Sequence, residues 1–216
     1  MSVRRSGTVA LALGSGFGAV TSVMNEVASP VGAIGSRIAG TVWASVAEIV
    51  TLLLDAGWAW AALAVAAGAL AGTRTSGAAA GAVALIAATT TYYIADSILR
   101  EEPLAWYGPE LLQWSIAGVV LGLPLGVVGA SVKDAGVIGL LAGLTVPVGA
   151  TVQMIVLPPR SGAPGASPTT AWAQGIVFTA AAVAVAVVTA RFIADSRRRY
   201  ARGPDRPAPG RTRPVS

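Results

Sequence analysis

The sequence contains no cysteine and no histidine. The usual zinc, haem and iron–sulfur sites, disulfides, thiol nucleophiles and Ser–His or Cys–His catalytic pairs therefore lack the residues that build them. The chain also has no P-loop, no dinucleotide fingerprint and no HExxH motif. We accordingly expect no enzyme activity, no metal and no cofactor. One catalytic alternative stays open, a lipid-active enzyme in which Asp96, Glu110 and Glu26 supply acid–base chemistry.

Charge is scarce as well. Charged residues make up 12% of the 216 positions and hydrophobic residues 54%, and the mean hydropathy is +0.68, whereas a soluble domain usually carries about 25% charged residues. Apolar stretches of about 17–25 residues, the length that crosses a bilayer, follow one another with short interruptions. The sequence therefore predicts an all-α, polytopic membrane helical bundle with six transmembrane helices. The expected spans are 7–28, 57–72, 76–99, 109–129, 135–157 and 170–194.

The stretch 38–54 has a different pattern. Its polar residues recur every three or four positions and therefore share one helical face. They are Arg37, Thr41, Ser45, Glu48, Thr51 and Asp55. This pattern predicts one amphipathic helix that lies in the interface plane or is wedged against the bundle, and a spanning helix is the further alternative. We expect residues 1–194 to form a single transmembrane helical domain and residues 195–216 a disordered basic cytoplasmic tail, because the tail is rich in Arg, Pro and Gly.

Positive charge predicts the orientation. With six spans and both termini cytoplasmic, twelve of the 15 Lys and Arg residues lie inside and three lie outside. A seven-span alternative with the N-terminus outside gives eleven inside against four outside, which is less favourable. The first span resembles a signal peptide in its Arg4–Arg5 start, but Glu26 would occupy a position before the cleavage point that requires a small residue. We therefore expect a multi-pass protein of the cell membrane.

Small residues four apart allow helices in lipid to approach closely. Five of the six spans carry such glycine sets, which are Gly14/Gly18, Gly68/Gly72, Gly77/Gly81, Gly118/Gly122/Gly126 and Gly139/Gly143. They predict tight packing in the bundle, or contact with a membrane partner subunit or a second copy of the chain. The basic tail is expected to attract anionic lipid. Nucleic acid is not an expected partner, because no accompanying fold or aromatic platform is present.

Aromatic and acidic residues are concentrated on the predicted outer side, whereas ordinary aromatic belts decorate both interfaces. All six tryptophans, three of the four tyrosines and seven of the ten carboxylates lie there. Polar side chains inside span ends tend to face the bundle interior, because contact with lipid is costly. We therefore predict an outward-facing cup that binds a cationic or aromatic small molecule. Its expected residues are Asn25, Glu26, Trp58, Trp60, Tyr92, Tyr93, Asp96, Glu110, Gln113, Trp114, Gln153 and Gln174.

Two other interpretations of these residues stay open, namely interfacial anchoring by the aromatic side chains and a surface for a partner protein. The run from Asp55 to Asp96 contains Gly57-Trp58-Ala59-Trp60, the turn Gly72-Thr73 and the ending Tyr92-Tyr93-x-x-Asp96. In these features it resembles a family of uncharacterised six-helix integral membrane proteins from high-GC bacteria.

In outline, the chain is also similar to the substrate-binding components of energy-coupling-factor vitamin transporters. Those six-helix proteins bind a small molecule near the outer face. Ala10, Gly14 and Gly18 would be the counterpart of their small-residue motif that docks a coupling subunit. This resemblance implies a binding or transport component. The alternative is a structural or accessory membrane protein that packs against a partner through its glycine-rich helix faces.

Overall fold

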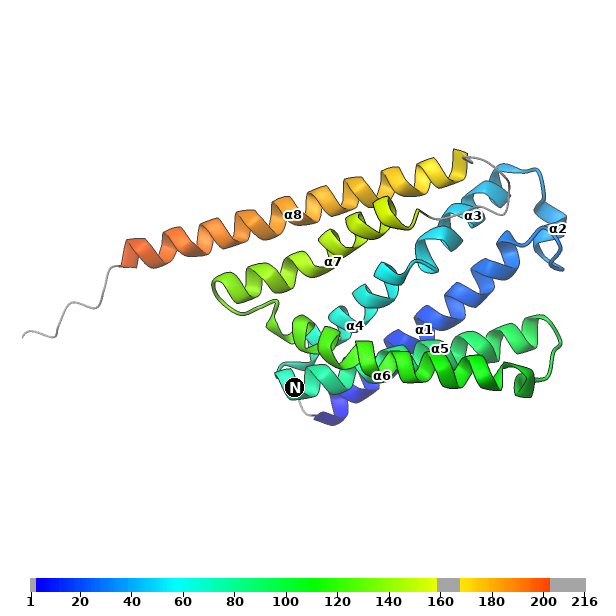
Figure 1. The fold of residues 1–216 in the computed structure, drawn as a ribbon, viewed down its shortest axis with the longest axis horizontal. Coiled ribbons are helices and arrows are strands. Elements are labelled where there is room, and N and C mark those ends of the chain that lie inside the picture. The colour runs from blue at the N-terminus through cyan, green and yellow to red at the C-terminus, as the bar shows by residue number, and fades with distance from the viewer. Residues whose placement is uncertain (1–2, 159–167, 203–216) are drawn as a thin grey trace, which may run out of the picture.

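The computed structural model describes residues 3–158 and 168–202, and within these ranges every regular element is helical. The order of the helices along the chain is α1 (Val3–Ala28), α2 (Gly35–Ile38), α3 (Val42–Leu54), α4 (Gly57–Ala71), α5 (Arg74–Leu99), the 3₁₀ helix η1 (Leu104–Tyr107), α6 (Gly108–Ser131), α7 (Val137–Val156) and α8 (Pro168–Arg202). The long helices run back and forth along one direction (Figure 1). The predicted all-α bundle is confirmed.

Five helices in the described part of the chain are long and apolar enough to cross a membrane. They are α1, α5, α6 together with η1, α7 and α8. They coincide with five of the six predicted spans. The sixth, predicted at 57–72, is α4, whose 15 residues extend only about 22 Å, less than the roughly 30 Å of a hydrocarbon core. Helices α3 and α4 together have the length and apolarity of a span, with a bend of 61° between them.

The break between α3 and α4 is stabilised by one side chain of α4 and one side chain of α7. Such a break frees carbonyl groups at the end of α3 and N–H groups at the start of α4, and these must find partners in a membrane protein. The indole Nε1 of Trp60 donates to the carbonyl oxygen of Leu54 at 3.1 Å. The backbone N–H of Trp58 donates to Oε1 of Gln153 on α7 at 2.8 Å.

Helix α3, which covers most of the stretch predicted to be interfacial, packs against α1 and α8. In Figure 1 it continues the path of α4 along α1. Its first turn is capped by Thr41, whose hydroxyl oxygen accepts from the N–H of Ala44 at 3.4 Å. The predicted amphipathic helix is therefore part of the bundle, because one of its sides packs against α1 and α8.

Glycine contacts hold the centre of the bundle together. A Cβ atom at Gly14 or Gly18 on α1 would overlap the carbonyl groups of Ala84 and Ala88 on α5. The α5–α6 and α4–α6 contacts are built in the same way, by Gly77, Gly81, Gly122, Gly126, Gly68 and Gly129. The adjoining core is mostly alanine, with Leu63 and Leu85 as its larger buried members. Close backbone approach thus replaces large interdigitating side chains.

Helices α7 and α8 pack against each other and join the rest of the bundle through α3, α4 and α6. Ala56, Ala150, Met154 and Val177 form the buried cluster at this junction. Helix α8 has 35 residues, a length of roughly 52 Å, and its last part projects beyond the other helices (Figure 1). It includes positions 195–202 of the predicted tail, and positions 203–216 lie outside the described residues.

The start of α1 and the end of α8 lie at the same end of the bundle, which we call the terminal end (Figure 1). The loops around α2 and η1 lie at the opposite end, which we call the far end. This arrangement follows from an even number of crossings, with α3 and α4 counted as one.

Candidate functional site

Three polar side chains from separate helices meet at the far end. The amide nitrogen Nδ2 of Asn25 on α1 donates to the hydroxyl oxygen of Tyr92 on α5 at 3.0 Å. The same nitrogen lies 3.3 Å from Oδ1 of Asp55, which follows α3 directly. Because one amide reaches both partners, the end of α1, the α3–α4 break and α5 are joined at a single point.

In the described chain, two buried side-chain oxygen atoms without partners belong to Asn25 itself and to the last turn of α3. Oδ1 of Asn25 is buried and has no hydrogen-bond partner among the described residues, and the same holds for Oγ1 of Thr51. Thr51 stands one turn before Asp55, whose N–H donates to the Thr51 carbonyl oxygen at 2.9 Å. Buried polar atoms without a partner are costly. We call Asn25, Thr51, Asp55 and Tyr92 the Asn25 cluster.

Aromatic rings continue from the cluster toward η1. The rings of Tyr92 and Tyr93 meet edge to face with centroids 5.2 Å apart. Tyr93 in turn contacts Tyr107 of η1 at 5.4 Å. The hydroxyl group of Tyr107 donates to the carboxylate of Glu102. Three tyrosines from two segments therefore form a continuous series of ring contacts that begins at the Asn25 cluster.

Asp96 lies one turn beyond Tyr92 on α5 and is buried, with 5% of its surface exposed. Its Oδ1 accepts from Nε of Arg100 at 3.1 Å, and the arginine is half exposed. Partial burial lowers the pKa of Arg100, but the charge and hydrogen bond of Asp96 outweigh this effect and raise it. Asp96, a predicted member of the cup, is therefore inside the bundle, and Arg100 is the residue that pairs with it.

Glu26 on α1 is buried like Asp96 on α5, with 6% of its surface exposed. The loop before α2 folds over it, since a Cβ atom at Gly32 would overlap the carboxylate group. No salt bridge reaches this carboxylate within the described part of the chain. Glu26 is adjacent to Asn25 in sequence, so a buried carboxyl group lies one residue from the Asn25 cluster.

Three other predicted site residues belong to the junction with the α7–α8 pair. Gln153 accepts from the N–H of Trp58, and Nε2 of Gln174 donates to the carbonyl oxygen of Met154 at 3.4 Å. Trp58 is half-buried among the residues of this junction, and its Nε1 is a buried donor without a partner in the described chain. Trp60 packs edge to face on Phe17 at 5.3 Å. The contacts of Trp58, Gln153 and Trp60 stabilise the broken helix next to Asp55, and none of them is a hydrogen bond to the Asn25 cluster.

The remaining predicted residues lie on the outside of α6. Glu110, Gln113 and Trp114 are exposed, Trp114 by 54%. Trp43, Trp106 and Trp172 also project from the bundle. Exposed tryptophans at one end of a membrane protein are typical of interfacial anchors, so this interpretation fits these four side chains.

The structure thus brings together Asn25, Tyr92, Tyr93 and Asp96 from the predicted set, with Glu26 beside them. Asp55, Thr51 and Tyr107 belong with them but were not predicted as site residues. Thr51 and Asp55 are the last two residues of the polar face that we assigned to an interfacial helix. This polar face is the sequence feature that could have identified them as site residues.

Negative charge dominates the far end. Among the described residues this end has seven carboxylates and two arginines, Arg37 and Arg100, which gives a charge difference of −5. The carboxylates are Glu26, Glu48, Asp55, Asp96, Glu101, Glu102 and Glu110. Arg160 lies outside the described residues. No three acidic side chains in the described ranges are grouped closely enough to hold a metal ion. The field of this end attracts cations and repels anions.

No protein-family model, no curated protein and no solved structure matches the chain. Both family resemblances described above therefore stay predictions from the sequence, and the site must be interpreted from its own chemistry.

Proposed function

We propose that this multi-pass membrane protein is a small-molecule binding or transport component whose Asn25 cluster holds a small organic cation at the far end. The observation that carries the proposal is the buried, unpartnered Oδ1 of Asn25, whose amide nitrogen lies 3.3 Å from the Asp55 carboxylate. A second unpartnered oxygen, Oγ1 of Thr51, stands one helical turn before Asp55. A ligand that donates hydrogen bonds would satisfy such atoms.

The chemistry of the cluster favours a cation. Its members offer oxygen acceptors and one carboxylate, and a positively charged ammonium or amidinium group donates to such atoms through strong charge-assisted hydrogen bonds. The faces of Tyr92 and Tyr93 add cation–π attraction, worth roughly 0.5–2 kcal/mol per contact when desolvated. Asp55 is the one carboxylate in the cluster, whereas calcium takes six to eight oxygen ligands. An organic cation therefore fits better than a metal ion.

The accessory-protein alternative relies on glycine faces that are open to a partner. In the structure, most glycines of the predicted sets on α1, α4, α5 and α6 contact other helices of the same chain, namely Gly14, Gly18, Gly68, Gly77, Gly81, Gly118, Gly122 and Gly126. Apolar side chains, including Leu112 and Ile116 of α6, cover the exposed outer surface instead. This use of the glycines supports the binding component over the accessory role.

We further propose that the termini are cytoplasmic and that the far end faces the outside of the cell membrane. The terminal end carries Arg5, Arg74, Lys133 and the arginines of the last part of α8, which is the distribution that the positive-inside rule associates with the cytoplasm. A cation arriving from outside would then meet the negative end first.

The test is a titration of the purified full chain with two matched panels of metabolites, cationic and anionic, followed by thermal unfolding. We expect one or more amines or amidines to raise the unfolding temperature. Asp55→Asn should abolish the shift, whereas Glu101→Gln, which removes an exposed carboxylate of the same end, should preserve it. Stabilisation by anions alone, or by no compound in the panels, would leave the accessory role as the better explanation.

A further inference from the structure

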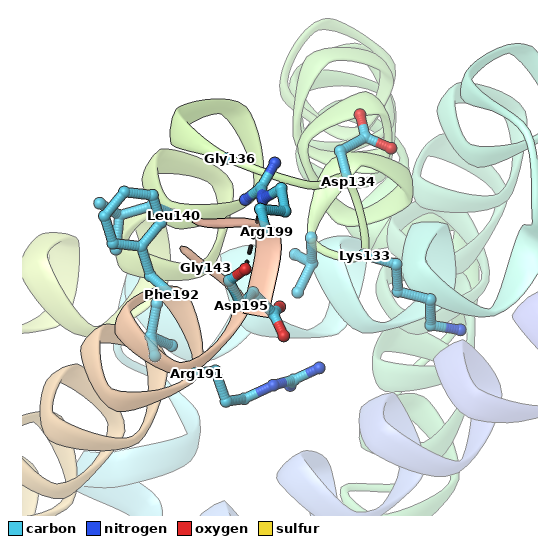
Figure 2. Close-up of a pocket in the computed structure, with 12 residues that line it drawn as sticks. Lys133, Asp134, Gly136, Leu140, Gly143, Arg191, Phe192, Asp195 and Arg199 are labelled. Carbon is cyan, nitrogen blue, oxygen red and sulfur yellow. Dashed lines mark hydrogen bonds between the residues drawn. The ribbon is translucent and has the colours of Figure 1, made fainter. Parts of the chain in front are cut away.

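A second polar site lies at the terminal end, far from the Asn25 cluster. A half-open cavity of about 60 Å³ lies between the α6–α7 loop, the first half of α7 and the last part of α8 (Figure 2). Its polar wall contains Lys133, Asp134, Arg191, Asp195 and Arg199. Its apolar wall is formed by Val132, Leu140, Val188 and Phe192.

Glycines on α7 allow α8 to approach and leave the space open. Gly143 faces Val188, whose Cγ1 would lie 3.0 Å from a Cβ atom added at the glycine. Gly136, with φ +85°, turns the chain into α7 next to the Arg199 guanidinium. The backbone conformation at Gly136 is one that other residues rarely adopt. The cavity is therefore built by the backbone of the α6–α7 turn as well as by side chains.

The charge inside the cavity is positive. Asp134 is already paired with Arg74, since the two side chains lie 2.8 Å apart. That leaves three cations, Lys133, Arg191 and Arg199, against the single carboxylate of Asp195, a difference of +2.

The three cations keep donors to spare. Lys133 uses one of its three donors on the carbonyl oxygen of Ala69 at 3.1 Å. Arg199 uses its Nε on the carbonyl oxygen of Asp195 at 3.4 Å, so both of its terminal nitrogens are left for a ligand. No salt bridge engages Arg191 within the described part of the chain.

The cavity also lies where the bundle changes from apolar to polar. Arg191, Asp195 and Arg199 are spaced by four and share the face of α8 that is turned to the cavity, which Figure 2 shows. The neighbouring positions of α7 and α8 carry three exposed apolar side chains. They are Ile138, Leu141 and Val187, with 55%, 62% and 51% of their surface exposed. A ligand bound here would meet cations on one side and the hydrocarbon of the membrane on the other.

We infer that this cavity binds the phosphate group of an anionic phospholipid from the leaflet at the terminal end. Arginine and lysine donors fit phosphate oxygens, and basic pockets at the ends of membrane helices are suited to anionic headgroups. The exposed apolar residues next to the cavity provide surface for the acyl chains, which a free phosphate ion would not use. The ligand is therefore a lipid headgroup.

The test compares two double variants of the full chain that lose the same charge from α8. Arg191→Gln with Arg199→Gln removes two cations from the cavity, and Arg197→Gln with Arg198→Gln removes two exposed cations of the same helix that do not line it. Purified proteins in neutral detergent are titrated with dioleoyl phosphatidylglycerol, dioleoyl phosphatidylcholine or inorganic phosphate. Thermal unfolding and native mass spectrometry report binding. All four substituted positions are exposed, and size-exclusion elution confirms that each variant is folded.

We expect phosphatidylglycerol to stabilise the unsubstituted chain and phosphatidylcholine to have little effect. The cavity variant should bind phosphatidylglycerol about tenfold more weakly or worse, since each charge-assisted bond to phosphate is worth roughly that factor. The matched variant should bind within about twofold of the unsubstituted chain. Arg191→Lys with Arg199→Lys should be intermediate, because it keeps the charge but loses the planar donor pair.

Three results would overturn the inference. Equal weakening in both double variants would mean that the whole basic end attracts lipid without a site. Full stabilisation by inorganic phosphate would identify a soluble phosphate as the ligand. Absence of any effect of phosphatidylglycerol on the unsubstituted chain would exclude the lipid.

Discussion

Nδ2 of Asn25 lies 3.0 Å from the hydroxyl oxygen of Tyr92, and this contact joins α1 to α5 at the far end of the bundle. The two residues are 67 positions apart in the chain. The same amide reaches Asp55. Polar side chains therefore join the α3–α4 break to α1 and α5, two helices that also pack against each other through glycines. We therefore expect this contact to stabilise the bundle as well as to form part of the proposed site.

Loss of the Asn25 contact should be measurable as coupling energy. Asn25→Ala and Tyr92→Phe each remove one partner of the hydrogen bond, and the double variant removes both. We expect a coupling energy of about 0.5–1.5 kcal/mol, the usual net value of such a bond. Reversible unfolding of the purified chain in detergent gives the four free energies of the cycle. A coupling energy of zero would show that the bond does not stabilise the bundle.

Gly18 and Gly16 provide a matched pair on α1. A Cβ atom at Gly18 would overlap the carbonyl group of Ala88, whereas a Cβ atom at Gly16 has nothing within 4 Å. We expect Gly18→Ala to lower the free energy of unfolding by about 1–3 kcal/mol, because two helix backbones must separate. Gly16→Ala should leave it unchanged or raise it by up to about 1 kcal/mol through helix propensity. Thermal unfolding measures the change in stability of both variants. Equal changes in the two variants would contradict the close α1–α5 contact.

Gln153 should stabilise the break before α4. Gln153→Leu leaves the N–H of Trp58 without its acceptor, and we expect a loss of about 1–3 kcal/mol in unfolding free energy. Gln153→Glu keeps an acceptor and should cost less. Gln113→Leu, an exposed position on α6, is the control and should change stability by less than about 0.5 kcal/mol. If the control and Gln153→Leu cost the same, the contact at the break has no special role.

The proposed orientation can be tested with single cysteines, since the chain contains none. Ser36→Cys lies in α2 at the far end and Arg198→Cys in α8 at the terminal end, and both positions are exposed. In intact cells, a membrane-impermeant thiol reagent should label position 36 and leave position 198 unlabelled until the cells are opened. Labelling of position 198 in intact cells would reverse the orientation.

Some of this architecture follows from the sequence alone. Residence in a membrane and the number of long apolar helices depend on composition and on runs of about 20 residues, which are local properties. The concentration of carboxylates between the spans is likewise visible without a structure. The glycine spacing of α1, with Gly14 and Gly18, indicates a closely packed face, because residues four apart lie on one side of a helix.

The tertiary structure decided which of these faces meet. Asp55 and Thr51 were visible as a polar face, but only the 61° bend between α3 and α4 and the packing of α3 on α1 bring Asp55 to Asn25. Conversely, Gln113 and Trp114 share the level of the site along the membrane but are exposed on α6. Helical periodicity determines which residues share a face, whereas the direction of that face depends on how the helix is rotated against its neighbours. Here contacts between glycines and carbonyl groups from distant parts of the chain set that rotation. For this reason the sequence predicted which span ends carry polar residues, and the structure determined which of these residues meet.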